Sequence, residues 1–180
     1  PIFYHKRPIT IMKKIVVIVL VSLLICSCLS SSLAVQADDT ARDIEIKLER
    51  GMCYGTCPVY SVSLSGNGTV SWVGEMFVEV TGNQTGYVDP ALVGDLYDLL
   101  TEGGILDFED SYNHRNITDM PSATLTVRNG SFVKSVYHYH GDFTAPEGLV
   151  QMERAVDNVA NSSRWIGKYT SVEEIVGELI

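Results

Sequence analysis

The segment with the clearest potential for chemistry is the run Cys-Tyr-Gly-Thr-Cys-Pro at positions 53–58. A disulfide between Cys53 and Cys57 closes a ring of five residues, which contributes about 2 kcal/mol in the chain-entropy model, and Gly55 permits the bend that it needs. A redox pair usually has two intervening residues and a helix N-terminus, whereas Pro58 leads into an expected strand. A metal site needs two further ligands. We therefore favour the disulfide over metal binding, redox activity and free thiols.

Two histidines form a second group. His138 and His140 are two positions apart in an expected strand, so their side chains project to the same side and are placed to share a zinc ion. With Cys53 and Cys57 they make a Cys2His2 set, although spacing alone does not show that the two segments meet. We favour the simpler interpretation of two partly exposed histidines packed among aromatic residues, and hence no cofactor, with zinc as the alternative.

A third group is acidic. An expected loop contains Asp107, Glu109, Asp110 and Asp119 together with His114 and Arg115. Such carboxylates can bind calcium or serve acid–base chemistry, but the spacing of an EF-hand is absent and we expect a solvated loop. The chain also has no nucleophile elbow, phosphate-binding glycine loop or paired-histidine metalloprotease helix. No catalytic residue is therefore predicted.

Asparagine usage is typical of an exported chain. Five of the seven asparagines have Ser or Thr two positions later, namely Asn67, Asn83, Asn116, Asn129 and Asn161. These are predicted glycosylation sites if the host glycosylates proteins. For Asn67 and Asn129 the alternative is a hairpin turn, because glycine follows each of them.

The segments that must position these residues have the patterns of a sheet. Apolar and polar residues alternate over 44–48, 60–65 and 123–127, and further strands are expected at 69–73, 77–80 and 131–139. Gly-Asn-Gly at 66–68 and Asn-Gly at 129–130 turn two pairs of strands into hairpins. In the first hairpin only a three-residue loop, which pairs Leu64 with Val70 and Val62 with Trp72, keeps one face apolar.

Two helices are expected to cover that face. The first is capped by Asp89, has Pro90 at its first position and ends at two glycines, 103–104. Its predicted buried stripe is Leu92, Val93, Leu96, Leu99 and Leu100. The second begins at Pro146, and its apolar positions are Leu149, Met152, Val156, Val159 and Ala160, with Trp165 and Ile166 covering the edge of the core. Between the first helix and the second hairpin, residues 105–121 are expected to form a loop. The predicted fold is α+β, an antiparallel sheet built from hairpins with two principal helices packed on one face.

The N-terminal region has the pattern of a secretory signal. Met-Lys-Lys at 12–14 precedes eleven almost wholly apolar residues, 15–25. We favour ordinary cleavage after Ala37, with lipidation of Cys28 in a lipobox-like sequence and an uncleaved membrane anchor as alternatives. The predicted organisation is an N-terminal extension and signal or anchor at 1–37, a linker at 38–43, one α+β domain at 44–167 and a short C-terminal helix at 168–180.

The charge excludes nucleic acid as a partner. All 22 acidic residues but only nine of the 13 basic residues follow residue 37, so this part of the chain has a formal net charge of −13. Nucleic-acid binding needs a basic surface, and no basic run occurs after residue 37. A membrane contact is expected only through the N-terminal segment.

A family resemblance supports the same picture. The run Arg-Gly-Met-Cys-Tyr-Gly-Thr-Cys-Pro-Val-Tyr at 50–60, followed by Gly-Asn-Gly-Thr-Val at 66–70, resembles an exported prokaryotic family known only as a domain of unknown function, the one numbered 6438. The likeness covers about 44–165 and includes the hairpin before Lys134, the helix start at Pro146 and the closing Trp165. The resemblance implies an exported α+β domain, often membrane-associated or lipid-anchored, with no established activity or catalytic residues.

We therefore expect an exported cell-envelope or extracellular module without enzymatic activity that binds a protein, a glycan or an envelope component through its loops. The alternative is a zinc-binding protein or metal-dependent enzyme that uses His138 and His140.

Overall fold

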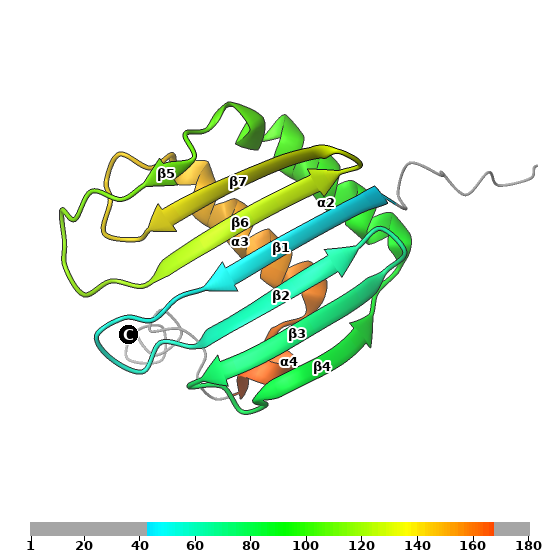
Figure 1. The fold of residues 1–180 in the computed structure, drawn as a ribbon, viewed down its shortest axis with the longest axis horizontal. Helices are drawn as coiled ribbons and strands as arrows, with labels where there is room; N and C mark the ends of the chain where they lie inside the picture. Colours follow the sequence, from blue (N-terminus) through cyan, green and yellow to red (C-terminus); the bar gives the residue numbers. More distant parts are fainter. Residues whose placement is uncertain (1–42, 168–180) are drawn as a thin grey trace, which may run out of the picture. The chain divides into compact units, whose positions relative to one another are not determined.

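The computed structural model describes residues 43–167, whose fold is drawn in Figure 1. In chain order the elements are β1 (Ile44–Arg50), β2 (Val59–Ser65), β3 (Thr69–Met76), β4 (Gly82–Tyr87), α2 (Pro90–Glu102), η2 (Ile105–Asp107), β5 (Ser111–Tyr112), β6 (Ser122–Asn129), β7 (Phe132–Tyr139), α3 (Glu147–Ala160) and α4 (Ser163–Ile166). The predicted signal or anchor segment, Cys28 and the predicted C-terminal helix lie outside the described residues.

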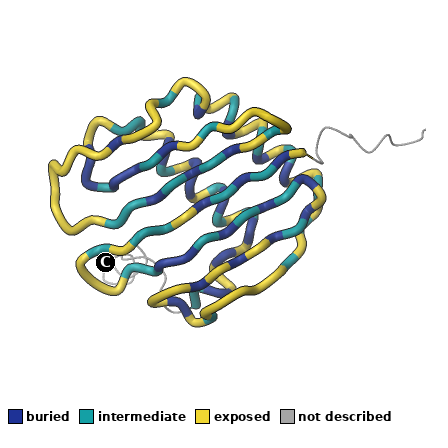
Figure 2. The backbone as a smooth tube through the Cα atoms, viewed as in Figure 1, coloured by how far each residue is buried: buried dark blue, intermediate teal, exposed yellow. Residues whose placement is uncertain are grey.

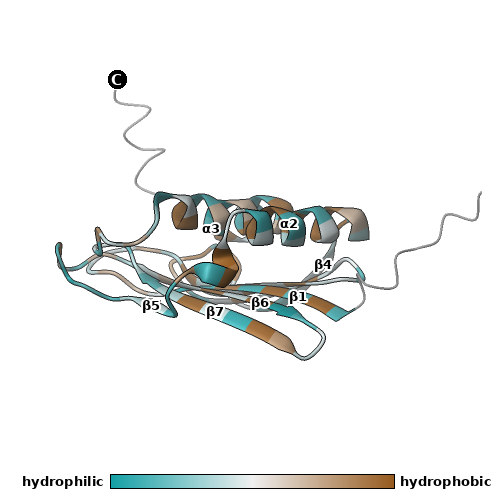
Figure 3. Cartoon of the chain, turned by 90° about the horizontal axis from the view of Figure 1, so that it is seen from above, coloured by the Kyte–Doolittle hydropathy of each residue, from teal (hydrophilic) through white to brown (hydrophobic). Residues whose placement is uncertain are grey.

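The seven strands form one sheet in the order β4-β3-β2-β1-β6-β7-β5. Every neighbouring pair is antiparallel except β5 and β7, which are parallel. Helices α2 and α3 lie on the same face of this sheet, as the view in Figure 3 shows. This confirms the predicted α+β fold with two principal helices on one face. No helix within residues 43–167 is long and apolar enough to span a bilayer.

The first hairpin has the predicted register. Leu64 pairs with Val70 and Val62 pairs with Trp72. Gly68 has a φ of 87°, the left-handed conformation that a three-residue loop requires at this position. All four paired side chains are buried, so the length of the loop decides which face of the hairpin enters the core.

The core lies between the sheet and the two helices. The central strand β1 contributes Ile46 and Leu48, and α3 contributes Leu149, all with no exposed surface. Figure 2 shows how buried and less buried residues alternate along the central strands. On the face that the helices leave uncovered, polar residues such as Lys47 and Ser63 lie in register across neighbouring strands.

Helix α2 begins as predicted. The Asp89 side chain accepts a hydrogen bond from the Ala91 amide at 3.0 Å, and Pro90 occupies the first helical position. Its buried stripe is narrower than predicted, because Val93, Leu96 and Leu100 are buried whereas Leu92 and Leu99 are 47% and 50% exposed. A helix lying on a sheet buries only its contact stripe, and these two leucines lie on the flank of that stripe.

The predicted strand at 77–80 is wrong. Phe77 has a left-handed φ of 53°, and the chain bends there. Pairing with β3 begins only at Gly82, the first residue of β4. The backbone of Val80 instead makes two other hydrogen bonds. The Trp72 indole donates to the Val80 carbonyl at 3.0 Å, and the Val80 amide donates to the backbone carbonyl of Trp165, in α4, at 2.9 Å. Of the three apolar residues here only Val78 is buried, whereas Phe77 is exposed, so the apolar run does not indicate a strand.

Residues 105–121 are more ordered than the predicted loop. They contain the short helix η2 and strand β5, which pairs Tyr112 with His138. Two residues in parallel pairing leave no periodic pattern in a sequence. Trp165 covers the edge of the core as predicted, stacked on Trp72 with ring centroids 5.3 Å apart.

Candidate functional site

Three loops meet at one end of the sheet, at the left of Figure 1. They comprise residues 51–58, 113–121 and 140–146, and we call them the loop end. Backbone hydrogen bonds join them, because the Tyr54 amide donates to the Asp119 carbonyl at 3.2 Å and the Ile117 amide donates to the Gly141 carbonyl at 3.2 Å. Segments that are far apart in the sequence therefore form one continuous surface.

The favoured disulfide is present in the first of these loops. Cys53 and Cys57 are bonded, with their Cα atoms 5.8 Å apart. Bonded sulfurs are not thiolate ligands, so the Cys2His2 combination with His138 and His140 is wrong. A structural disulfide indicates a compartment other than the reducing cytosol.

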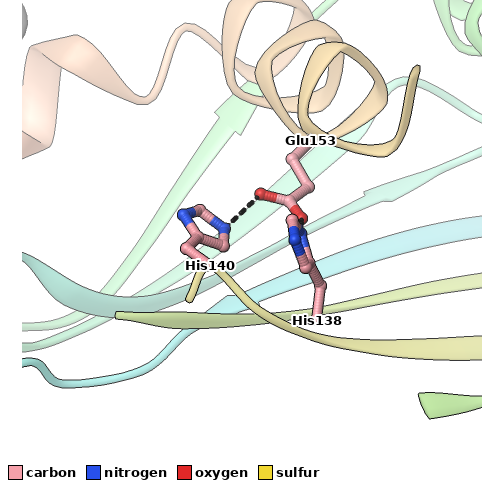
Figure 4. Close-up of side chains that lie close together, drawn as sticks. All are labelled: His138, His140 and Glu153. Atoms are coloured by element: carbon pink, nitrogen blue, oxygen red, sulfur yellow. Dashed lines mark hydrogen bonds and ion pairs between the residues drawn. The ribbon is translucent and has the colours of Figure 1, made fainter. Parts of the chain in front are cut away.

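Strand β7 and helix α3 bring together the two predicted histidines and an unpredicted glutamate. His138 lies in β7 and His140 follows the strand by one residue, so both rings project to the same side, with centroids 4.5 Å apart. Glu153 lies on the face of α3 that packs on the sheet. Figure 4 shows its carboxylate between the two imidazoles.

The carboxylate of Glu153 contacts both rings. His138 Nδ1 lies 2.7 Å from Oε1, and His140 Nε2 lies 2.9 Å from Oε2. The side chain of Glu153 has no exposed surface, that of His138 is 5% exposed and that of His140 is 20% exposed. The prediction of two partly exposed histidines is therefore wrong for His138, because strand β7 directs it under α3.

Three further polar side chains complete this group. Arg50 donates from one guanidinium nitrogen to Glu153 Oε2 at 2.6 Å and from the other to Asp157 Oδ2 at 2.8 Å. The Tyr60 hydroxyl donates to Asp157 Oδ1 at 2.8 Å. We call the group of His138, His140, Glu153, Arg50, Asp157 and Tyr60 the buried polar cluster.

The environment shifts the acidities within this cluster. Burial by itself raises the pKa of the Glu153 carboxyl, but hydrogen bonds from His138 and His140 and the charge of Arg50 outweigh it and lower that pKa to about 2. Burial opposes the charge of Arg50, but the charge of Asp157 in particular outweighs it and raises the pKa of the guanidinium. Burial and the charge of Asp157 raise the pKa of Tyr60, so its hydroxyl stays a donor.

The buried polar cluster contains more carboxylates than fixed cations. Glu153 and Asp157 are carboxylates and Arg50 is the one fixed cation, which leaves one excess negative charge. An uncompensated charge in an interior is costly, so this excess favours a cation beside the carboxylates. Within residues 43–167, His138, His140 and Glu153 are the one group of three or more such side chains whose ligand atoms, here within 4.8 Å of one another, are close enough to hold a metal ion.

The predicted acidic loop does not make a comparable site. Asp110 pairs with Lys134 at 2.7 Å, and its side chain is 85% exposed. His114 instead contacts Asp142, whose side chain has no exposed surface. The acidic residues of the segment are thus distributed along the surface, as expected for a solvated loop.

A second buried carboxylate, Asp142, ties two of the loops together. It accepts hydrogen bonds from the His114 amide at 2.7 Å, the Thr144 amide at 2.8 Å and the Thr144 hydroxyl at 2.7 Å. Burial opposes its charge, but these donors outweigh burial and lower the pKa of Asp142. This carboxylate joins the loop at 113–121 to the turn after β7.

The predicted glycosylation sites remain predictions. The side chains of four of them, Asn67, Asn83, Asn116 and Asn161, are exposed, and Asn129 is half-buried. Asn67 accepts a hydrogen bond from the Thr69 amide at 3.0 Å and forms the hairpin turn that its glycine neighbours predicted.

The loop end also carries large apolar side chains in solvent. Their exposed fractions are 89% for Tyr54, 69% for Phe143, 64% for Met52, 48% for Ile117 and 36% for Met120. All five come from the three joined loops, and the disulfide constrains the loop that presents two of them.

One comparison with known proteins matches this domain. The sequence model of one protein family, described as a domain of unknown function (DUF6438), matches residues 44–160. That span contains the buried polar cluster and the whole loop end. No curated protein matches the chain.

Proposed function

The chain belongs to the DUF6438 family of domains of unknown function, and we propose that it is an exported, non-enzymatic module that binds a protein partner through its loop end. The observation that carries this proposal is the set of exposed apolar residues on the three joined loops. Exposed hydrophobic residues that occur singly need no explanation, whereas a set gathered on adjoining loops does.

The chemistry of the loop end suits a protein surface. Tyr54, Phe143 and Met52 belong to the aromatic and methionine types that are enriched at protein interfaces. Arg115, another enriched type, lies over the Tyr139 ring at 5.5 Å. Hydrogen bonds between the loops and the Cys53–Cys57 disulfide hold the surface in one conformation, which lowers the entropic cost of binding.

The charge of the chain indicates what kind of protein fits. After residue 37 the formal net charge is −13, so a partner with a basic surface is attracted and an anionic membrane is repelled. The proposed partner therefore has an apolar contact area surrounded by basic residues.

Two features support export. The apolar run at 15–25 after two lysines has the pattern of a secretory signal, and the disulfide fits an oxidising compartment. The non-enzymatic assignment is supported by the absence of a catalytic motif from the sequence.

Site-specific photo-crosslinking tests the partner. A photoreactive phenylalanine analogue is placed at position 54 in the full chain, expressed in its own host, and compared with the same analogue at Tyr87, which is 66% exposed and lies in edge strand β4. We expect a discrete protein adduct from position 54 alone, and we expect the double variant Phe143→Ala/Met52→Ala to reduce its yield at least fivefold.

The matched control is the double variant Leu92→Ala/Leu99→Ala, which removes two comparably exposed apolar side chains from the flank of α2 and is expected to leave the yield unchanged. Equal adducts from positions 54 and 87, or none from position 54, contradict the proposal. A glycan-array signal that requires Tyr54 would replace the protein partner with a glycan. Turnover of a model ester or phosphate ester that is lost with His140→Ala would overturn the non-enzymatic assignment.

A further inference from the structure

We propose that His138, His140 and Glu153 bind one divalent transition-metal ion, and that zinc is the ion this set of ligands fits best. The inference concerns the interior beneath the loop end and does not depend on a protein partner. It rests on the convergence of three ligand side chains, from β7, from the residue that follows it and from α3, and on the charge of their surroundings.

The geometry is close to that of a metal site. Zinc lies about 2.0–2.2 Å from histidine nitrogens and carboxylate oxygens, so two of its ligand atoms are about 3.3 Å apart in a tetrahedral site. Here His138 Nδ1 and His140 Nε2 lie 2.7 and 2.9 Å from the Glu153 oxygens. All the ligand atoms lie within 4.8 Å of one another, which is close enough to hold one metal ion.

The charge of the cluster favours a cation at this position. Two carboxylates, Glu153 and Asp157, face one guanidinium, Arg50, and the Glu153 side chain has no exposed surface. Arg50 contacts Oε2 at 2.6 Å and leaves Oε1, the oxygen beside His138, as the oxygen for the ion. Its charge weakens binding of a cation, but the same contact fixes the carboxylate, as hydrogen bonds to ligands do in metal sites.

The type of ligand selects the ion. Two imidazoles and one carboxylate suit zinc and similar transition metals, whereas magnesium and calcium prefer sites made only of oxygen ligands. Three protein ligands also leave a fourth position for water or for a group of another molecule. His140 is the most exposed of the three side chains, so the ion enters on its side, toward the loop end.

Binding of zinc to the full chain tests the site. The full chain is purified without chelators, and any bound metal is removed before the titration. We expect calorimetry to show one zinc per chain and no binding of magnesium. Cobalt in place of zinc is expected to give the intense visible absorption of a four- or five-coordinate ion. His140→Ala, which removes a partly exposed ligand, is expected to weaken zinc binding by more than about 100-fold, since even outer partners of a ligand contribute about 10- to 100-fold.

The matched control is His114→Ala, which removes a histidine that also lies beside a buried carboxylate but outside the ligand set, and which should leave zinc affinity unchanged. Circular dichroism and urea unfolding establish that each variant is folded. Glu153→Gln provides a second test, because it keeps the shape of the side chain and loses the ligand charge. The proposal is overturned if the folded wild-type chain binds no zinc, or if His140→Ala and Glu153→Gln bind it as tightly as wild type.

Discussion

Glu153 and Asp142 are both buried carboxylates beside a histidine at the same end of the sheet, yet the protein stabilises them in different ways. Around Asp142 the close donors are the amides of His114 and Thr144 and the Thr144 hydroxyl. Around Glu153 the donors are Arg50 from strand β1, the imidazole of His138 from β7 and the imidazole of His140, which follows β7 by one residue.

The two carboxylates differ in the chemical reactivity of the groups that surround them. Amide and hydroxyl donors cannot change their charge, so the surroundings of Asp142 are suited to a fixed structural role. Imidazole nitrogens are common metal ligands, so the groups around Glu153 offer a chemistry that amides and hydroxyls lack. The same type of residue is thus structural in one region and adaptable in the other, and the identity of its donors makes the difference.

Removing the Glu153 carboxylate should have the largest effect. Glu153→Ala leaves Arg50 and two imidazoles in the interior without their anion, so we expect the free energy of unfolding to fall by about 3–5 kcal/mol. Urea unfolding measures this, with Gln151→Ala, at an exposed position of the same helix, as the control. A loss no larger than that of the control would show that the buried polar cluster contributes nothing to stability.

Lowering the pH should also reduce the free energy of unfolding through Glu153, by somewhat less than Glu153→Ala does. The pKa of Glu153 falls from about 4.5 in the unfolded chain to about 2 in the folded one, so its contribution is complete above pH 4.5 and is lost as the pH falls through about 2. The contribution is on the order of 3 kcal/mol. Urea unfolding at a series of pH values measures it.

In the same pH series, the variant Glu153→Gln distinguishes the contribution of Glu153 to stability from that of Asp142. We expect it to be less stable at neutral pH and to show a flatter dependence between pH 4.5 and 2. Because the pKa of Asp142 is also lowered, some dependence should remain in this variant. A slope equal to that of wild type would assign the acid sensitivity to Asp142 and reverse the comparison.

Much of the fold followed from local patterns. Alternation and turn chemistry fixed the register of Leu64 with Val70, because a shift by one residue moves every side chain to the other face. The error at 77–80 arose where a long-range contact decides the structure: the Trp72 indole and α4 take the hydrogen bonds that a strand would have used. Such contacts leave no periodicity in the segment itself.

Only part of the candidate site was predictable from the sequence. The spacing of His138 and His140 indicated a shared direction, but Glu153 and Arg50 were missed although each left a signal. Arg50 continues the inward positions of β1 after Leu48, and Glu153 interrupts the apolar stripe of α3, so each is a charged residue at a position expected to be buried. Their partnership was not predictable, because it joins residues 103 positions apart.

The smallest effects should come from the Asp142 region, and they should be local. Asp142→Asn keeps one acceptor oxygen but loses the charge that two amides and a hydroxyl stabilise, so the turn after β7 should open more often. Hydrogen exchange measures this at the amides of His114 and Thr144, where we expect exchange at least fivefold faster, with little change in β1 and β6.

The variant His114→Ala tests whether amide and hydroxyl donors or an ion pair with the His114 imidazole stabilise the Asp142 carboxylate. The imidazole is 75% exposed and 3.1 Å from the carboxylate, whereas the His114 amide is closer and remains in the variant. Exposed ion pairs are screened by water, so we expect no change in exchange at Thr144 and no shift of the urea midpoint. If His114→Ala loosened the turn as much as Asp142→Asn, Asp142 would depend on a titratable partner as Glu153 does, and the two regions would no longer differ in kind.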